Sequence, residues 1–118
     1  MLIEASNVFG QPENEAVIIE RIRRQIQQEQ FRITVHAQHE MDEEHYQVGE
    51  VLESLVAGKL IENYPEHRRG ACCLILGYTR DKRPVHIVCT TEFELLIIIT
   101  VYEPKVPKWP SPMQRRNL

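Results

Sequence analysis

Two histidines in this sequence have the surroundings that acid–base chemistry requires. His36 lies four residues before Glu40, so on a helix the imidazole and the carboxylate share one face. The carboxylate can then orient the imidazole and raise its basicity, as a general base needs. His86 lies in a later, strand-like segment. The structural alternatives are an exposed helix pair worth about 0.3 kcal/mol and a hydrogen-bonded histidine in a half-buried sheet.

The last two apolar segments predict strands, each with one face that carries polar groups. Side chains alternate across a strand, so in the segment 84–91 His86 lies on the polar face. In the segment 94–102 the same rule separates Leu95, Ile97, Ile99 and Val101 from Leu96, Ile98, Thr100 and Tyr102. If the polar faces of the two strands coincide, one concave surface is lined by His86, Thr90, Thr100 and Tyr102.

Positive charge gathers in the second half of the chain. Residues 1–63 hold 5 Lys/Arg and 12 Asp/Glu, a balance of −7, whereas residues 64–118 hold 9 Lys/Arg and 5 Asp/Glu, a balance of +4. The basic half can face phosphates while the acidic half faces away, although ordinary solvated surface also explains the asymmetry. The candidates for contacts to phosphates and to unpaired bases are Tyr64, Arg80, Arg83, Lys105 and Trp109.

The cysteines predict neither a metal site nor a disulfide framework. Cys72 and Cys73 are adjacent and Cys89 stands alone, so no paired zinc-ligand spacing is present. We therefore expect no metal and no cofactor. No secretory signal is expected at residues 1–4, which contain no basic segment, and no apolar run approaches the roughly 20 residues of a membrane helix. These features together favour a protein of the reducing cytoplasm.

Helices are expected in the first half of the chain. Isoleucines spaced four apart predict a helix over about 13–30. Thr34 can cap a short second helix over 35–44. Apolar residues at i, i+3, i+4, i+7 and i+8 predict a third helix from Val48, which Gly58 ends.

After Gly58 the apolar period changes to two, which predicts strands. Four strands are expected, over 59–64, 71–79, 84–91 and 94–102, whereas the segment 31–35 is short and extended. Short connections favour antiparallel neighbours, and the last strand is apolar on both faces, which favours an interior position. The prediction is an α+β fold, with N-terminal helices packed on a four-stranded, mainly antiparallel sheet. It comprises a loose lead-in over 1–11, one domain over 12–104, and a proline-rich, basic tail over 105–118, expected to be extended.

Several segments, in their order and spacing, resemble one bacterial family. They are residues 33–37, 40–41, 51–58, 61–65, 73–77, 83–88, 98–104 and 108–109. This pattern looks like the family catalogued as domain of unknown function 4258, over about residues 31–116. The resemblance implies a fold like that of the RelE/MqsR-type toxins and a toxin of a toxin–antitoxin pair that cleaves mRNA without a metal. It also implies a small zinc-finger, helix-turn-helix antitoxin as the partner.

The resemblance carries over six polar positions, which are His36, Glu40, Tyr64, His86, Thr100 and Tyr102. This sequence also departs from the pattern. Many members have an arginine where Glu40 stands, so Arg80 or Arg83 would have to supply the missing cation.

Two functions fit these features. As a metal-independent endoribonuclease, the chain would use His36 as the base and His86 as the acid when a 2′-hydroxyl attacks the neighbouring phosphate. Arg80 and Arg83 would stabilise the developing charge, and Tyr102 would position the nucleotide. As a non-catalytic interaction module, the sheet would bind a small antitoxin-like protein, and the histidines would be structural. Catalysis of this kind requires His36 and His86 to converge on one cleft.

Overall fold

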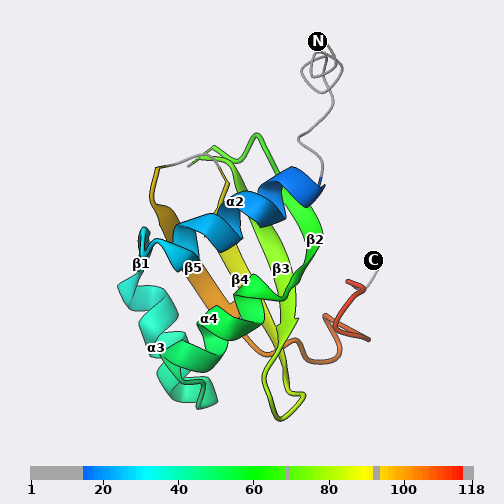
Figure 1. Ribbon diagram of the computed structural model, residues 1–118. Helices are drawn as coiled ribbons and strands as arrows, with labels where there is room; N and C mark the ends of the chain where they lie inside the picture. The colour runs from blue at the N-terminus through cyan, green and yellow to red at the C-terminus, as the bar shows by residue number, and fades with distance from the viewer. Residues whose placement is uncertain (1–14, 69, 92–93, 116–118) are drawn as a thin grey trace.

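The computed structural model describes residues 15–68, 70–91 and 94–115, so the expected lead-in over 1–11 lies outside the described residues. These residues form three helices and five strands (Figure 1). In chain order they are α2 (Glu15–Gln27), β1 (Phe31–Ile33), α3 (Val35–Glu44), α4 (Val48–Val56), β2 (Lys59–Tyr64), β3 (Cys72–Tyr78), β4 (Pro84–Thr90) and β5 (Leu96–Tyr102). The α+β class is as predicted, and so is the order of the three helices and of strands β2 to β5.

The sheet has the strand order β1-β5-β4-β3-β2. Strands β2 to β5 form the antiparallel meander that their short connections predict, and β5 is an interior strand. The predicted count of four strands is wrong, because β1 pairs in parallel with β5 and makes the sheet five-stranded and mixed. A three-residue segment carries too little alternation to predict a strand. It becomes one because β5 offers it hydrogen-bonding partners about 65 residues later.

Helices α2 and α4 lie across one face of the sheet, and α3 lies beside β5 (Figure 1). Between the helices and the sheet is the main apolar core. Its fully buried members include Ile22, Met41, Val51, Leu55, Ile75, Ile87, Leu96, Ile98 and Val101. Each such side chain contributes about 1.5–3 kcal/mol through its burial. This layer covers one face of the sheet and leaves the other face to the remaining segments of the chain.

Strand β5 does not alternate as predicted. Val88 of β4 lies opposite Thr100, whereas Cys89, on the other face of β4, lies opposite Ile98. Residues opposite one another share a face, so a β-bulge puts Ile98 and Thr100 on opposite faces. The predicted grouping of Leu96 and Ile98 with Thr100 is therefore wrong. Alternation alone cannot show where a strand gains an extra residue.

The bulge also puts Val101 in the core beside Ile98, although strict alternation predicts opposite faces. On the face away from the helices, Tyr102 lies opposite His86 and Thr100 lies opposite Val88. The predicted polar face that carries His86, Thr100 and Tyr102 is therefore confirmed.

The C-terminal segment, residues 105–115, lies against this second face, and we name it the strap. Trp109 of the strap is only 3% exposed. The strap contains turns, closed by hydrogen bonds from Trp109 N to Lys105 O and from Gln114 N to Ser111 O, so it is not extended throughout as predicted. An aromatic ring that buries a large apolar area explains why the segment packs instead of remaining solvated. We name the covered side of the sheet the strap face.

Candidate functional site

His86 lies on the strap face with no exposed surface. Its Nδ1 is 3.1 Å from the hydroxyl oxygen of Tyr102, and its Nε2 is 2.7 Å from the carbonyl oxygen of Pro112 in the strap. The Trp109 ring meets the imidazole edge-on, with 4.3 Å between ring centroids. Two strands and the strap therefore position this histidine, and the pairing of β4 with β5 brings Tyr102 beside it.

The partners of His86 determine where its proton lies. A carbonyl oxygen can only accept a hydrogen bond, so Nε2 carries the proton and donates it to Pro112. Burial lowers the pKa of His86, which keeps the imidazole neutral, so Nδ1 accepts a hydrogen bond from the Tyr102 hydroxyl. Burial also raises the pKa of Tyr102 and keeps that hydroxyl protonated. The site is a neutral histidine joined to a protonated tyrosine.

A second polar group lies between the strap and β2. The guanidinium of Arg115 donates two hydrogen bonds to the Glu62 carboxylate, at 3.0 and 2.8 Å. The Tyr64 hydroxyl also donates to Glu62 and lies 3.4 Å from Arg115 Nη2. The same guanidinium lies 4.8 Å from the centroid of the Trp109 ring. We name the pair of Glu62 and Arg115 the latch, because it joins the end of the strap to the sheet.

The sequence analysis missed Glu62 as a site residue. The available signal was its spacing from Tyr64, since residues two apart on a strand share a face. Nothing in that spacing indicated Arg115 as its partner, 53 residues later.

His36 and Glu40 form the predicted pair on α3, with 3.3 Å between His36 Nε2 and Glu40 Oε2. The other carboxylate oxygen of Glu40 accepts a hydrogen bond from the backbone N–H of Val101, at 2.8 Å. Thr34, the N-cap of α3, donates to the backbone carbonyl of Ile99. Strand β1 ends before it reaches this part of β5, so no neighbouring strand is available there for hydrogen bonding. The side chains of Thr34 and Glu40 take its place and bond to the backbone of β5. The geometry gives Glu40 a structural role.

Removing the Glu40 carboxylate should therefore reduce stability. Glu40→Ala leaves the buried N–H of Val101 without a partner, and we expect the free energy of unfolding to fall by about 1–3 kcal/mol in urea titrations. Glu40→Gln keeps a side-chain oxygen and should cost less. His36→Ala is the control, with an expected change within about 0.5 kcal/mol, because its side chain is 66% exposed. An equal loss for His36→Ala and Glu40→Ala would contradict the structural role.

The two histidines are placed differently. His36 is exposed on α3, whereas His86 is enclosed beneath the strap. The structure therefore does not open both imidazoles onto one cleft, which the predicted acid–base pairing requires.

Residues 33–103 match the model of a family described as domain of unknown function (DUF4258). This chain belongs to that family. The matched region runs from the end of β1 past β5, so it includes His86 and Tyr102 but not the strap or α2. No curated protein and no solved structure matches the chain.

Within the DUF4258 region, Arg83 is held by several groups. Its guanidinium donates to the Glu103 carboxylate at 3.2 and 3.1 Å and to the backbone carbonyls of Glu44 and His45. It also lies over the ring of Tyr46, 3.8 Å from the centroid. Arg83 therefore connects the end of α3 to β4 and to the end of β5. These contacts account for the position of Arg83 without a bound phosphate.

The other two predicted phosphate contacts also have carboxylate partners. Arg80 donates two hydrogen bonds to Glu53 on α4, at 3.2 and 2.9 Å, on an exposed surface. Lys105 Nζ lies 3.7 Å from a carboxylate oxygen of Glu44. Exposed pairs of this kind contribute at most about 1 kcal/mol, so an anionic ligand could replace either carboxylate.

Of the predicted base-stacking residues, Tyr64 is half-buried in the latch region and Trp109 is buried against His86. Thr100 lies half-buried on the strap face. The strap face of this DUF4258 chain therefore gathers four predicted residues, Tyr64, His86, Thr100 and Tyr102, with Trp109 covering His86.

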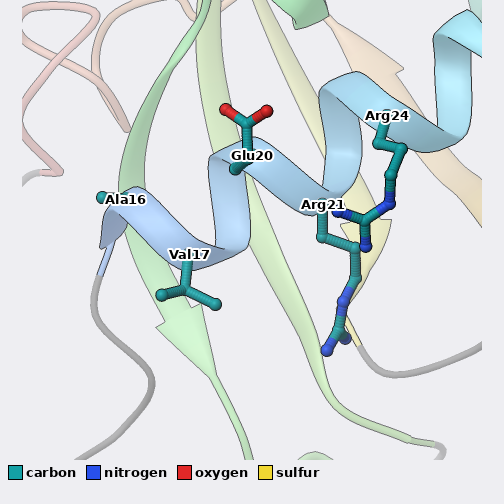
Figure 2. Close-up of a pocket in the computed structure, with 5 residues that line it drawn as sticks. All are labelled: Ala16, Val17, Glu20, Arg21 and Arg24. Atoms are coloured by element: carbon teal, nitrogen blue, oxygen red, sulfur yellow. The ribbon is translucent and has the colours of Figure 1, made fainter.

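A shallow hollow lies on α2, away from His86, and Figure 2 shows the residues that line it. They are Ala16, Val17, Glu20, Arg21 and Arg24. Val17 and Arg21 extend to one side of the helix and Glu20 to the other (Figure 2), and Arg21 donates to the backbone carbonyl of Thr91. The hollow contains none of the predicted site residues.

Across the part of the chain that the structure describes, no three His, Cys, Asp or Glu side chains are grouped so as to hold a metal ion. The three cysteines are buried free thiols. No helix in the described ranges is long and apolar enough to cross a bilayer.

Proposed function

We propose that this DUF4258 chain is a metal-independent endoribonuclease, the mRNA-cleaving toxin of a toxin–antitoxin pair, and that it acts from the strap face. The observation that supports this is the His86–Tyr102 contact at 3.1 Å, in which burial displaces both pKa values. A directly bonded pair of titratable groups with perturbed pKa values is typical of catalytic sites. Tyr64 and Arg115 lie on the same side of the sheet and offer a hydroxyl and a positive charge.

The proposed reaction starts from the tautomer of His86 that carries its proton on Nδ1, in place of the tautomer described above. The 2′-hydroxyl of a nucleotide then gives its proton to Nε2 of His86 while its oxygen bonds to phosphorus. The bond from phosphorus to the 5′-oxygen breaks, and the departing oxygen takes the proton of the Tyr102 hydroxyl. Tyr102 recovers a proton from Nδ1 of His86 across their hydrogen bond. The products are a 2′,3′-cyclic phosphate and a 5′-hydroxyl, so the step needs neither a metal nor an oxidant.

Arg115 would stabilise the negative charge that develops on the phosphate, as guanidinium groups do in phosphoryl transfer. Tyr102 takes the role of acid, and His86 takes the role of base that the sequence suggested for His36. The raised pKa of Tyr102 keeps its proton available at neutral pH, and the lowered pKa of His86 keeps the imidazole uncharged. His36 is not needed for this step.

The proposed partner is a small zinc-finger, helix-turn-helix antitoxin. Its support is the family resemblance, which includes a likeness to RelE/MqsR-type toxins, in which helices pack on an antiparallel sheet. The three helices of the described residues lie on one side of the sheet or at its edge, so the opposite face is available to a substrate or to a partner once the strap moves.

Cleavage of single-stranded RNA by the purified full-length chain tests the proposal. We expect His86→Gln and Tyr102→Phe each to lower the cleavage rate by about 10²–10⁴-fold, the usual contribution of a general acid or base. His36→Gln should stay within a few-fold of the wild type, and EDTA should have no effect. Cleavage that is indifferent to both His86→Gln and Tyr102→Phe would refute the proposed site.

One observation favours the second candidate, a non-catalytic interaction module. Both nitrogens of His86 are already bonded inside the protein, and the predicted phosphate-binding cations are paired with carboxylates. This candidate predicts a tight complex with an antitoxin-like protein, together with intact RNA and no growth arrest when the chain is expressed. Growth arrest that a neighbouring gene product relieves would count against it.

A further inference from the structure

We propose that the strap is an autoinhibitory element, in which the carbonyl group of Pro112 holds His86 in the tautomer that cannot accept a proton from a substrate. The geometry of this inference stands by itself, and its consequence for catalysis rests on the proposed function. Besides covering His86, the strap determines which of the two ring nitrogens of His86 carries the proton.

The hydrogen bonds of the closed site carry the inference. Nε2 of His86 gives its proton to Pro112, and Nδ1 receives the proton of Tyr102. In this arrangement the imidazole has no free lone pair, and the tyrosine proton points inward. The proposed base, His86, and the proposed acid, Tyr102, are therefore both engaged in hydrogen bonds within the protein and cannot act on a substrate.

The other tautomer would make both groups available. With the proton on Nδ1, His86 donates to the oxygen of Tyr102, its Nε2 lone pair is free, and the tyrosine proton can point outward. Under the closed strap this tautomer would set the Nε2 lone pair against the carbonyl oxygen of Pro112 at 2.7 Å, which is repulsive. The closed strap therefore selects the inactive tautomer.

Two of the contacts that hold the strap closed are not ideal. The latch between Glu62 and Arg115 is partly exposed, with side-chain exposures of 24% and 42%, so solvent weakens it. Trp109 is buried, but its indole N–H, which lies near the Tyr102 hydroxyl, makes no hydrogen bond of normal geometry among the described residues. Such a donor is costly to bury, which reduces the gain from closing the strap.

The chemistry of the latch indicates what opens it. A carboxylate and a phosphodiester both present two anionic oxygens to the fork of a guanidinium group. An RNA phosphate can therefore take the place of Glu62 on Arg115. The phosphate backbone of the substrate would thus release the strap, and the release would allow the proton of His86 to move from Nε2 to Nδ1.

The test compares full-length Glu62→Ala with Glu53→Ala. Both changes remove the carboxylate of a bidentate pair with arginine, but Glu53 pairs with Arg80, away from the strap. Trp109 is the only tryptophan of the chain, so its fluorescence reports the strap. The nitrogen chemical shifts of the His86 ring report the tautomer. Trp109→Ala, read by the same nitrogen shifts, is the second variant in case Glu62→Ala leaves the strap closed.

We expect Glu62→Ala to move the tryptophan emission to longer wavelength and to place the His86 proton at least partly on Nδ1, with RNA cleavage at least tenfold faster than in the wild type. Glu53→Ala should change none of the three. A ring that keeps its proton on Nε2 in both Glu62→Ala and Trp109→Ala overturns the inference, whatever happens to RNA. A proton that moves to Nδ1 without cleavage by any variant supports the tautomer lock and overturns the proposed ribonuclease.

Discussion

Trp109→Ala is expected to lower the free energy of unfolding by about 3–5 kcal/mol, the usual cost of deleting a buried tryptophan side chain. The indole is 3% exposed and packs edge-on against His86. Its loss uncovers the imidazole and removes the ring beneath the Arg115 guanidinium. Urea unfolding followed by far-ultraviolet circular dichroism measures the change.

Trp109→Phe is the matched variant. It keeps an aromatic ring in place and removes an indole N–H that makes no hydrogen bond of normal geometry among the described residues, so we expect a loss below about 1.5 kcal/mol. If Trp109→Ala is as stable as the wild type, the strap is not docked in solution and cannot restrain His86.

The second large effect is expected at Gly77 of β3, where α4 packs closely on the sheet. A Cβ atom at this position would lie 2.4 Å from the backbone oxygen of Ser54 and 2.8 Å from its Cβ. Backbone atoms of a packed helix cannot move aside as a flexible side chain can. Gly77→Ala should therefore push α4 away from β3 and lower the free energy of unfolding by about 1–3 kcal/mol or more.

Gly49→Ala provides the control on α4 itself. A Cβ atom there meets nothing within 4 Å, and alanine favours a helix over glycine by about 0.8–1 kcal/mol. We expect this variant to be more stable than the wild type, so the same substitution should have opposite signs at the two sites. Urea unfolding of Gly77→Ala and Gly49→Ala measures the two changes in the free energy of unfolding. A neutral Gly77→Ala would show that α4 does not pack on β3 as closely as described.

The sequence by itself determined the local elements. The second helix and the first predicted strand have the bounds that were expected, over 35–44 and 59–64. Thr34 caps its helix through a hydrogen bond to the backbone N–H of Ala37, as its residue type predicts. These features depend on neighbours a few residues away, so periodicity and capping chemistry contain the information needed.

The sequence also indicated most members of the strap face. His86, Thr100 and Tyr102 were expected on one surface because each lies at the polar position of its strand. Tyr64 joins them from β2. What the pattern could not supply was the state of His86, since its partners at Pro112 and Trp109 belong to a segment with no periodicity.

Tertiary structure alone decided the remaining features. Strand β1 exists because β5 pairs with it, and the bulge in β5 arises from its pairing with β4. The Glu40 carboxylate accepts a hydrogen bond from the backbone N–H of Val101. His36 is exposed, whereas His86 is buried. The physical reason is common to all of them. Hydrogen bonds and burial depend on which distant atoms come within about 3–4 Å, and no local pattern of residue types specifies that distance.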